Sequence, residues 1–304
     1  MTFGLVVAGS ASGADMPLKA PSPPAVFNWT GFYGGANVGY GGGNSNNTWN
    51  IFAANTVSTV CPTAGGGALC VVGADSDRMN GVLGGLQIGY NWQTGRYVFG
   101  IETDFDATGQ RGSQTFNGAN GAITLVPAGF GPLAAAPVAA AYTEKLSWLG
   151  TFRGRVGVAS DRTLFYATGG LAYGEVKSTG SATISGANTN TPFFVSTGCT
   201  ATFPAFGTCP LSNWSNSADK TGWTLGGGIE QAFAGSWSAK VEYLYVDLGR
   251  ANTTFATSPG CFGGAAGFGC NFMVPGTGTV SSRITDNIVR VGINYRFNDQ
   301  SVVQ

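Results

Sequence analysis

Histidine is absent from this 304-residue sequence, and charged residues make up only 10% of it. Without histidine the chain has no Ser–His pair, no histidine base near neutral pH and no imidazole ligand for a metal. Lysine and arginine together number 15, as do aspartate and glutamate, so we expect no basic surface of the kind that nucleic acids require. The composition therefore predicts no enzymatic activity, no cofactor, no metal site and no nucleic-acid partner.

Long uninterrupted apolar runs are also missing. The most apolar stretch, residues 121–140, contains Pro127, Pro132 and Pro137, which a membrane-spanning helix would not carry so densely. We predict a loop there, whose apolar side chains would either bind an extracellular partner or fold over the mouth of the domain. The sequence thus predicts no transmembrane helix.

The first residues are typical of a secreted protein. Residues 1–14 contain an apolar run followed by small residues, as at the end of a signal peptide, although the basic segment that usually precedes the run is missing. Cleavage would fall before Ala14 or before Asp15. Residues 15–29 follow as a proline-rich leader, a composition that favours an extended conformation.

Six cysteines form three close pairs, each enclosing eight or nine residues rich in glycine, proline, threonine and alanine. The pairs are Cys61 and Cys70, Cys199 and Cys209, and Cys261 and Cys270. This spacing favours local disulfides, which form in an oxidising compartment. Thiolate metal binding is the alternative, but it usually requires CxxC spacing and often a histidine.

A period of two in the side chains predicts β-strands. In residues 97–106, an apolar face alternates with a second face that carries Glu102, Asp104 and Asp106. In residues 146–158, the pattern places Leu146 and Trp148 on the apolar face. Eight segments are alternating or glycine-rich in this way: 31–40, 81–92, 97–106, 146–158, 164–174, 221–233, 237–245 and 287–297.

Short and long connections alternate between these segments. Residues 93–96, 159–163 and 234–236 are short, whereas the other four connections run to about 30 to 45 residues. A two-sheet sandwich does not predict this alternation, but a membrane barrel does, with short turns on one side and long loops on the other. We predict an all-β fold, an eight-stranded antiparallel up-and-down transmembrane β-barrel over residues 30–297, with long extracellular loops and a C-terminal tail at 298–304.

The interior of so narrow a barrel is filled by side chains, and charges there must be paired. Five acids and five bases fall on the inward faces of the predicted strands, and we expect them to form a plug of ion pairs. They are Glu102, Asp104, Asp106, Glu230 and Glu242 with Arg153, Arg155, Lys240, Arg290 and Arg296. The alternative is that they line the constriction of a narrow porin-like channel for small solutes.

Several segments together resemble one protein family. They are ADMPLKAP at 14–21, FNWTGFYGGANVGYG at 27–41, LSWLGTFRGRVGVASDRTLFYATGGLAYG at 146–174, KTGWTLGGGIEQAFAGSWSAKVEYLYVDLG at 220–249 and DNIVRVGINYRF at 286–297. They are similar to the Omp25/Omp31-type outer-membrane immunogenic proteins of alphaproteobacteria. The resemblance implies an OmpA-like eight-stranded barrel in the bacterial outer membrane, in contact with lipid and lipopolysaccharide. It also implies a role as surface antigen, envelope-stabilising protein or porin-like protein.

The resemblance also suggests a link to peptidoglycan. In some relatives a mature N-terminus that begins Ala-Asp is joined covalently to peptidoglycan, and Ala14 and Asp15 stand at the expected cleavage site. Ala14 would then be the attached residue, and a flexible leader without attachment is the alternative. The predicted function is a structural protein that stabilises the envelope and presents disulfide-braced surface loops.

Overall fold

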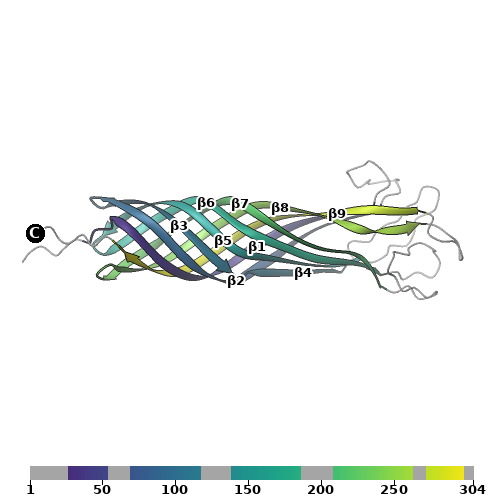
Figure 1. Ribbon diagram of the computed structural model, residues 1–304, viewed down its shortest axis with the longest axis horizontal. Coiled ribbons are helices and arrows are strands. Elements are labelled where there is room, and N and C mark those ends of the chain that lie inside the picture. The colour runs from purple at the N-terminus through teal and green to yellow at the C-terminus, as the bar shows by residue number, and fades with distance from the viewer. Residues whose placement is uncertain (1–26, 54–68, 118–137, 186–207, 263–271, 298–304) are drawn as a thin grey trace, which may run out of the picture.

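The computed structural model describes residues 27–53, 69–117, 138–185, 208–262 and 272–297 (Figure 1). Nearly all of these residues belong to strands, which are β1 (Gly31–Ala53), β2 (Leu69–Thr94), β3 (Tyr97–Thr108), β4 (Arg111–Asn117), β5 (Val138–Ser160), β6 (Thr163–Ser185), β7 (Thr208–Ala234), β8 (Trp237–Phe262) and β9 (Phe272–Arg296). Among the described residues, none forms a helix long and apolar enough to cross a membrane.

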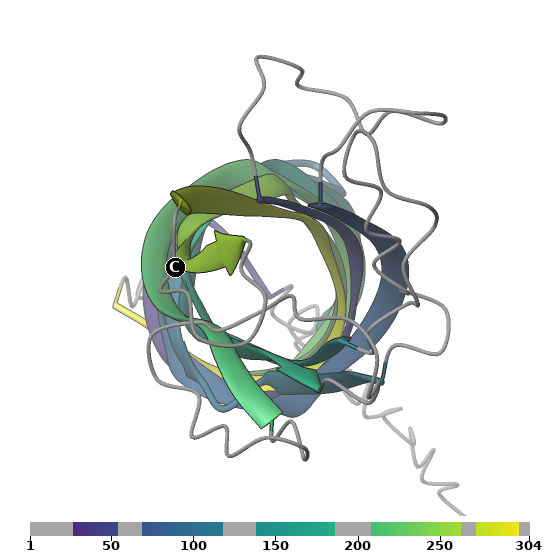
Figure 2. The same cartoon turned by 90° about the vertical axis from the view of Figure 1, so that its right-hand side faces the viewer.

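The strands close into a ring in which all neighbours are antiparallel. β1 pairs with both β2 and β9, and the other neighbours follow chain order, so the sheet has no open edge along the wall (Figure 2). β3 and β4 share one position in the ring, because both pair with β5. The ring therefore has eight strand positions, and the predicted all-β antiparallel barrel is confirmed.

A short irregularity separates β3 from β4, and the sequence gives no sign of it. The amide of Gly109 donates to the carbonyl of Val82, and the carbonyl of Gln110 accepts from the amide of Leu146, so both residues stay attached to neighbouring strands. The buried Gln110 side chain donates to Asp286 across the lumen at 2.6 Å. The break therefore lets a polar side chain enter the lumen.

Three two-residue turns join neighbouring strands at one end of the barrel, called here the turn end. Gly95, Asp161 and Gly235 begin these turns with positive φ values of 61°, 52° and 51°. Positive φ suits the tight hairpins whose twist matches that of the flanking strands, and glycine and aspartate tolerate it well. The opposite end, from which the long connections leave, is called the loop end.

The strands are much longer than the alternation predicts. Residues 31–40 and 164–174 are the predicted segments, whereas β1 extends to Ala53 and β6 to Ser185. A strand of about 9 to 11 tilted residues crosses a bilayer, so every strand except β3 and β4, which share one position in the ring, continues well beyond one membrane thickness. The alternation of apolar and polar side chains stops where lipid stops, which is why the sequence pattern shows only the turn-end half.

Lipid-facing side chains cover the turn-end half of the wall. Large apolar residues such as Phe99, Leu171 and Val241 are about half exposed or more there, as expected when the solvent is hydrocarbon. Aromatic rings gather at two levels. Those near the turn end are Phe32, Tyr90, Trp92, Tyr97, Trp237, Tyr295 and Phe297. Those farther toward the loop end, which form the upper aromatic girdle, are Tyr40, Phe105, Trp148, Tyr173, Trp223, Tyr243 and Tyr245. The two levels form the aromatic girdles of a membrane barrel.

The predicted alternation places Leu146 on the apolar face with Trp148, which in a membrane barrel is the face toward lipid, and for Leu146 this is wrong. Leu146 is buried in the lumen with 1% exposure. Opposite β6, Leu146 pairs with Val176 and Trp148 with Glu175, so Ser147 is an extra residue in the ladder. This β-bulge reverses the alternation, and a strict period of two cannot show it.

The cysteine pairs and the chain termini fall largely outside the described residues. Cys70, Cys209 and Cys261 have backbone positions in β2, β7 and β8 near the loop end, whereas Cys61, Cys199 and Cys270 lie outside the described part of the chain. Ala14, the tail at 298–304 and residues 121–137 also lie outside it. Of the loop predicted at 121–140, residues 138–140 are described, and they belong to β5 and not to a loop.

Candidate functional site

A layer of charged side chains fills the barrel near the middle of its membrane-facing half. The alternation of β3 turns Glu102, Asp104 and Asp106 inward. In the sheet register, Glu102 lies opposite Arg153, Glu230 opposite Lys240, and Glu242 opposite Arg290. Acids and bases from β3, β5, β7, β8 and β9 therefore arrive at similar heights. All of these side chains are at most 5% exposed.

Arg153 joins three carboxylates from two sides of the lumen. Its Nη2 lies 2.5 Å from Glu102 Oε1 and 2.8 Å from Asp104 Oδ2, and its Nη1 lies 3.1 Å from Glu242 Oε1. Its Nε donates to Thr151 Oγ1 at 2.9 Å. All three guanidinium nitrogens are thus used, as a buried arginine requires.

Arg290 performs the same task from β9. Its Nη1 lies 2.9 Å from Asp106, and its Nη2 lies 2.7 Å from both Asp104 and Glu242. Asp104 and Glu242 are therefore shared by Arg153 and Arg290. The two arginines and their acids form one continuous network across the lumen.

Lys240 and Arg155 complete the charged layer. Lys240 Nζ donates to both oxygens of Glu102 at 2.9 Å. Arg155 Nη1 lies 3.0 Å from Glu230, its Nε donates to Asn91 at 2.7 Å, and its guanidinium carbon lies 4.6 Å from the centroid of the Tyr33 ring. Nine of the ten residues expected in the lumen thus meet in the charged layer.

Arg296 is the exception, because it lies at the turn end and not in the charged layer. Its guanidinium carbon lies 4.0 Å from the centroid of the Phe27 ring, and Nη1 donates to the carbonyl of Asn28. Phe27 also packs edge-on to Trp29, which is 3% exposed. Residues 27–29, predicted to belong to the leader, therefore close the turn-end mouth of the barrel.

Without Arg296, the charged layer contains five acids and four bases, and neutral donors also bind the carboxylates of its three glutamates. The hydroxyl of Tyr33 donates to Glu102 at 2.8 Å, and that of Tyr166 donates to Glu242 at 2.9 Å. Ser238 and Asn294 donate to Glu230 at 2.6 and 2.8 Å. Sequence reasoning missed these donors. These residues occupy inward-facing positions in the alternation of their strands, which could have identified them, but only acidic and basic residues were predicted to lie in the lumen.

Glycines make room for the two tyrosines. A Cβ atom on Gly89 would lie 2.2 Å from the Tyr33 hydroxyl, and one on Gly228 would lie 2.7 Å from the Tyr166 hydroxyl. Carbon and oxygen cannot approach so closely without displacement of the ring. The glycine-rich strands therefore leave lumen space for large hydrogen-bonding side chains from across the sheet.

Apolar side chains close the lumen on both sides of the charged layer. A lower apolar cluster at the turn end contains Trp29, Val98, Leu164, Tyr166 and Ala232. An upper apolar layer toward the loop end contains Met79, Leu83, Leu146, Leu149, Ala172, Val176, Leu244, Val246, Leu248, Ala251, Ile284 and Ile288, each at most 6% exposed. The charged layer is thus enclosed between apolar layers.

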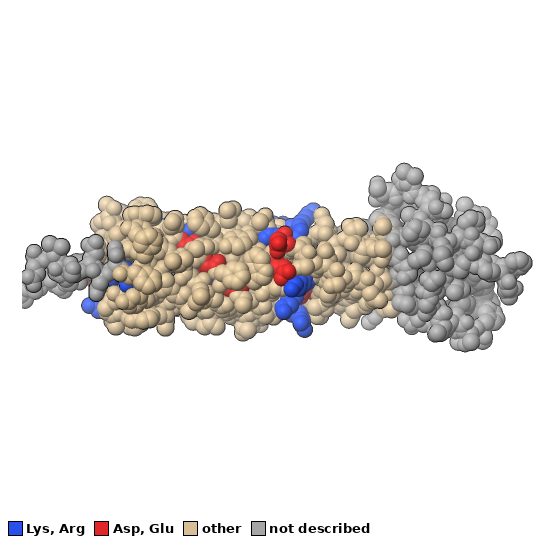
Figure 3. Space-filling view, viewed as in Figure 1, with Lys and Arg blue, Asp and Glu red and all other residues tan. Residues whose placement is uncertain are grey.

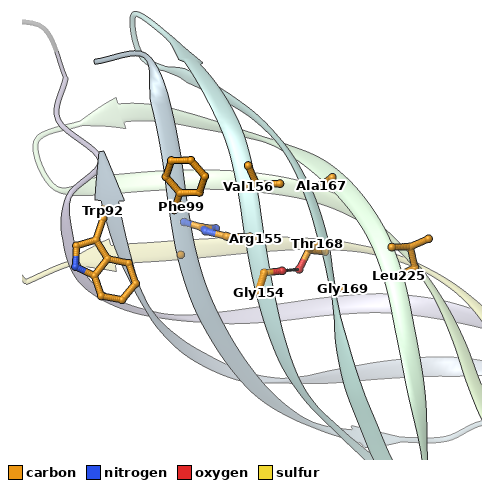
Figure 4. A pocket seen from close by; sticks show the side chains of 10 residues that line it. Trp92, Phe99, Gly154, Arg155, Val156, Ala167, Thr168, Gly169 and Leu225 are labelled. Atoms are coloured by element: carbon orange, nitrogen blue, oxygen red, sulfur yellow. Dashed lines mark hydrogen bonds between the residues drawn. The ribbon is translucent and has the colours of Figure 1, made fainter. Parts of the chain in front are cut away.

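A groove on the outer wall lies next to this lumen site (Figure 4). Gly154 and Gly169 face each other across β5 and β6, and the Thr168 hydroxyl donates to the carbonyl of Gly154 at 2.9 Å. The groove is lined by Phe99, Val156 and Leu225. Because the groove opens toward hydrocarbon and is lined mainly by apolar groups, it suits an acyl chain.

A closed antiparallel ring, an apolar outer wall between aromatic girdles and a polar lumen define an integral membrane β-barrel of the outer-membrane type. The sequence model of the outer membrane protein beta-barrel domain matches residues 5–297, and the chain belongs to this family. The protein is therefore located in the bacterial outer membrane.

Individual relatives agree with this assignment. The 31 kDa outer-membrane immunogenic protein of Brucella melitensis is 32% identical over 97% of this chain and 97% of its own length. The 22 kDa outer membrane protein of Rhizobium leguminosarum is 27% identical over 57% of this chain and 56% of its own length. The resemblance to immunogenic outer-membrane proteins is thus confirmed. Among solved structures, the outer membrane protease OmpT of Escherichia coli covers 88% of this chain and 97% of its own, but its TM-score of 0.39 and identity of 7% transfer no activity.

Proposed function

We propose that this protein is a structural component of the outer membrane, with a lumen closed to solutes. The observation that carries the proposal is the upper apolar layer, in which residues from β2, β5, β6, β8 and β9 meet across the lumen. Eight strands enclose a space just wide enough for side chains to fill. An ion would have to cross this apolar layer as well as the charged layer.

The charges of the lumen support the same role. Arg153 and Arg290 each contact several carboxylates directly, at 2.5 to 3.1 Å. A selective constriction needs charges that face water and release ions readily. Side chains bonded to one another in this way instead tie opposite walls of the barrel together.

Planar-bilayer recording tests the closed lumen. We expect the folded protein to show no steady conductance under conditions in which an equal amount of a 16-stranded porin conducts. Replacing Leu149 and Leu244 in the upper apolar layer with alanine should produce brief openings. The matched change of Leu171 and Leu225, which are 63% and 59% exposed on the outer wall, should not. Steady conductance of the unmodified protein would establish the alternative, a narrow porin-like channel.

We further propose that the loop end presents disulfide-braced loops at the cell surface. The support is that Cys70, Cys209 and Cys261 all have backbone positions at this end of the barrel, close in sequence to Cys61, Cys199 and Cys270. Peptide mapping without reduction should recover each local pair as one linked fragment. Recovery of six unlinked cysteine peptides from protein isolated with thiols blocked would contradict the proposal.

A link from Ala14 to peptidoglycan is proposed as the second anchor of the envelope. Its support is that β1 begins at Gly31 at the turn end, which in barrels of this class faces the periplasm. Mass spectrometry of muramidase-released material should find Ala14 bonded to a peptidoglycan fragment. Free amines throughout on Ala14 or Asp15 would show that residues 15–26 are only a leader.

A further inference from the structure

Three cations stand side by side on the outer wall, in what we call the cationic row. Arg111 of β4 pairs directly with Lys145 of β5, and Lys145 pairs directly with Lys177 of β6. All three alternate with buried neighbours and face outward. Arg78 extends the row, because Asn80, two residues along β2, pairs with Arg111. Directly opposed side chains in a sheet have Cβ atoms about 5 Å apart.

The chain itself does little to neutralise the cationic row. Glu144 and Asp77 are adjacent in sequence to Lys145 and Arg78, but they point into the lumen and are 1% and 7% exposed. Lys177 has a partner in Glu175, at 3.2 Å. Within the described part of the chain, no carboxylate lies within ion-pair distance of Arg78, Arg111 or Lys145. Like charges placed directly opposite each other destabilise a sheet.

The cationic row lies at the level of lipid headgroups. Trp148 and Tyr173 belong to the upper aromatic girdle, and the centroids of their rings lie 6.0 Å apart. Lys145 lies three residues beyond Trp148, and Lys177 four residues beyond Tyr173, in both cases toward the loop end. Figure 3 shows basic and acidic side chains gathered in a belt, between a lower wall on which only small patches of charged atoms are visible and the loop end. Aromatic girdles mark the membrane interface, so the belt faces the headgroups of the outer leaflet.

We propose that the cationic row binds the phosphate groups of lipopolysaccharide in the outer leaflet. Lysine and arginine form strong charge-assisted hydrogen bonds to phosphate, and a phosphorylated glycolipid held beside the wall would supply the missing anions. A bound phosphate would convert the repulsion among Arg111, Lys145 and Lys177 into attraction to a shared partner. The row is open on the wall, so the glycolipid must be held by its acyl chains as well as its phosphates. The proposal does not depend on whether the lumen conducts.

Binding of fluorescent bisphosphorylated lipid A to the folded protein in neutral micelles tests the proposal. The variant with Arg111→Gln, Lys145→Gln and Lys177→Gln should bind it more weakly, on the order of a hundred-fold, since each cation near an anionic surface contributes roughly a factor of five. The matched control neutralises Arg96 and Arg162, which are exposed at the turn end, and should bind as tightly as the unmodified protein. Equal affinity of the triple variant and the unmodified protein would overturn the proposal.

Two further arms separate the source of the anion and exclude misfolding. Dephosphorylated lipid A should bind as weakly as the triple variant binds the phosphorylated form, and inorganic phosphate should compete only poorly. Competition by inorganic phosphate at the same concentration as lipid A would contradict a lipid site. In lipid-free neutral detergent the triple variant should be at least as stable as the unmodified protein, because repulsion is removed. With lipid A added, the unmodified protein should gain the larger increase in thermal stability, and a gain equal to that of the variant would refute binding by the row.

Discussion

The charged layer in the lumen and the cationic row on the outer wall both contain arginine and lysine. In the lumen these cations contact carboxylates, whereas on the wall they lie beside one another. In the lumen, Arg153 is buried and contacts three carboxylates. On the wall, Lys145 lies between Arg111 and Lys177 in the sheet register. A buried charge must be paired within the protein because water cannot reach it. A charge at the headgroup level can be paired by the membrane instead.

The comparison also separates two reasons for an arginine in a strand. In the charged layer the planar guanidinium connects acids from different strands, and its loss leaves those acids buried without a cation. In the cationic row the charge faces outward, and the protein alone would be more stable without it. Stability measurements should therefore give opposite signs for the two regions.

The largest effect is expected from Arg153→Ala. This change leaves Glu102, Asp104 and Glu242 with one cation fewer in a site that water does not reach, and breaking a buried pair in this way costs about 3 to 5 kcal/mol of unfolding free energy. Urea unfolding in detergent, followed by heat-modifiable migration on gels, measures the loss. Arg162→Ala, at an exposed turn, is the control and should change little. Equal stability of the two variants would show that the network is dispensable.

Thinning the upper apolar layer should have the next largest effect. Ile288 is 1% exposed in the lumen, whereas Ile293 on the same strand is 50% exposed toward lipid. Ile288→Ala leaves a cavity and should cost about 2 to 5 kcal/mol. Ile293→Ala exchanges contacts with lipid and should cost clearly less. If the two changes cost the same in a urea titration, the upper layer is not a packed core.

A glycine substitution tests the neutral donors of the lumen. Gly89→Ala places a Cβ atom 2.2 Å from the Tyr33 hydroxyl, so the ring must leave Glu102, and overpacking of this kind costs about 1 to 3 kcal/mol. Gly154→Ala is the matched control, because the nearest atom to its Cβ is the carbonyl oxygen of Gly169 at 4.0 Å. Unfolding midpoints of the two variants compare a lumen-facing glycine with a lipid-facing one. A larger loss of stability for Gly154→Ala than for Gly89→Ala would contradict the assignment of Gly89 to the lumen face and Gly154 to the lipid face.

The sequence was sufficient to predict the barrel because a wall between lipid and a filled lumen imposes a strict period of two. Glu102, Asp104 and Arg290 could be assigned to the lumen from parity alone. The alternation shows which face of the strand a side chain lies on, but it does not show how far along the barrel axis the side chain lies. Arg296 has the inward parity of Arg290 but lies six residues closer to the turn end, where Phe27 and Asn28 meet it.

Local irregularities and long-range partners were not predictable in the same way. The bulge at Ser147 changes the face of Leu146 through a register shift that only the β6 partner reveals. Tyr33 and Glu102 are 69 positions apart in sequence, and their contact depends on strand order and tilt. The loop-end halves of the strands escaped prediction because, beyond the lipid, neither face has to be apolar.

The smallest effect is expected in two double-mutant cycles in neutral detergent. They compare directly the sign of the coupling energy in two pairs of residues. In the cycle of Arg111→Gln with Lys145→Gln, the coupling should be repulsive by roughly 0.2 to 1 kcal/mol, because the two cations are directly opposed. In the cycle of Arg283→Gln with Asp247→Asn, the coupling should be attractive, because Arg283 Nη2 lies 2.8 Å from Asp247 Oδ2. Chemical unfolding of the single and double variants gives both couplings. An attractive coupling between Arg111 and Lys145 without anionic lipid would mean that the protein already supplies their counter-charge, and the membrane would no longer be needed to explain the row.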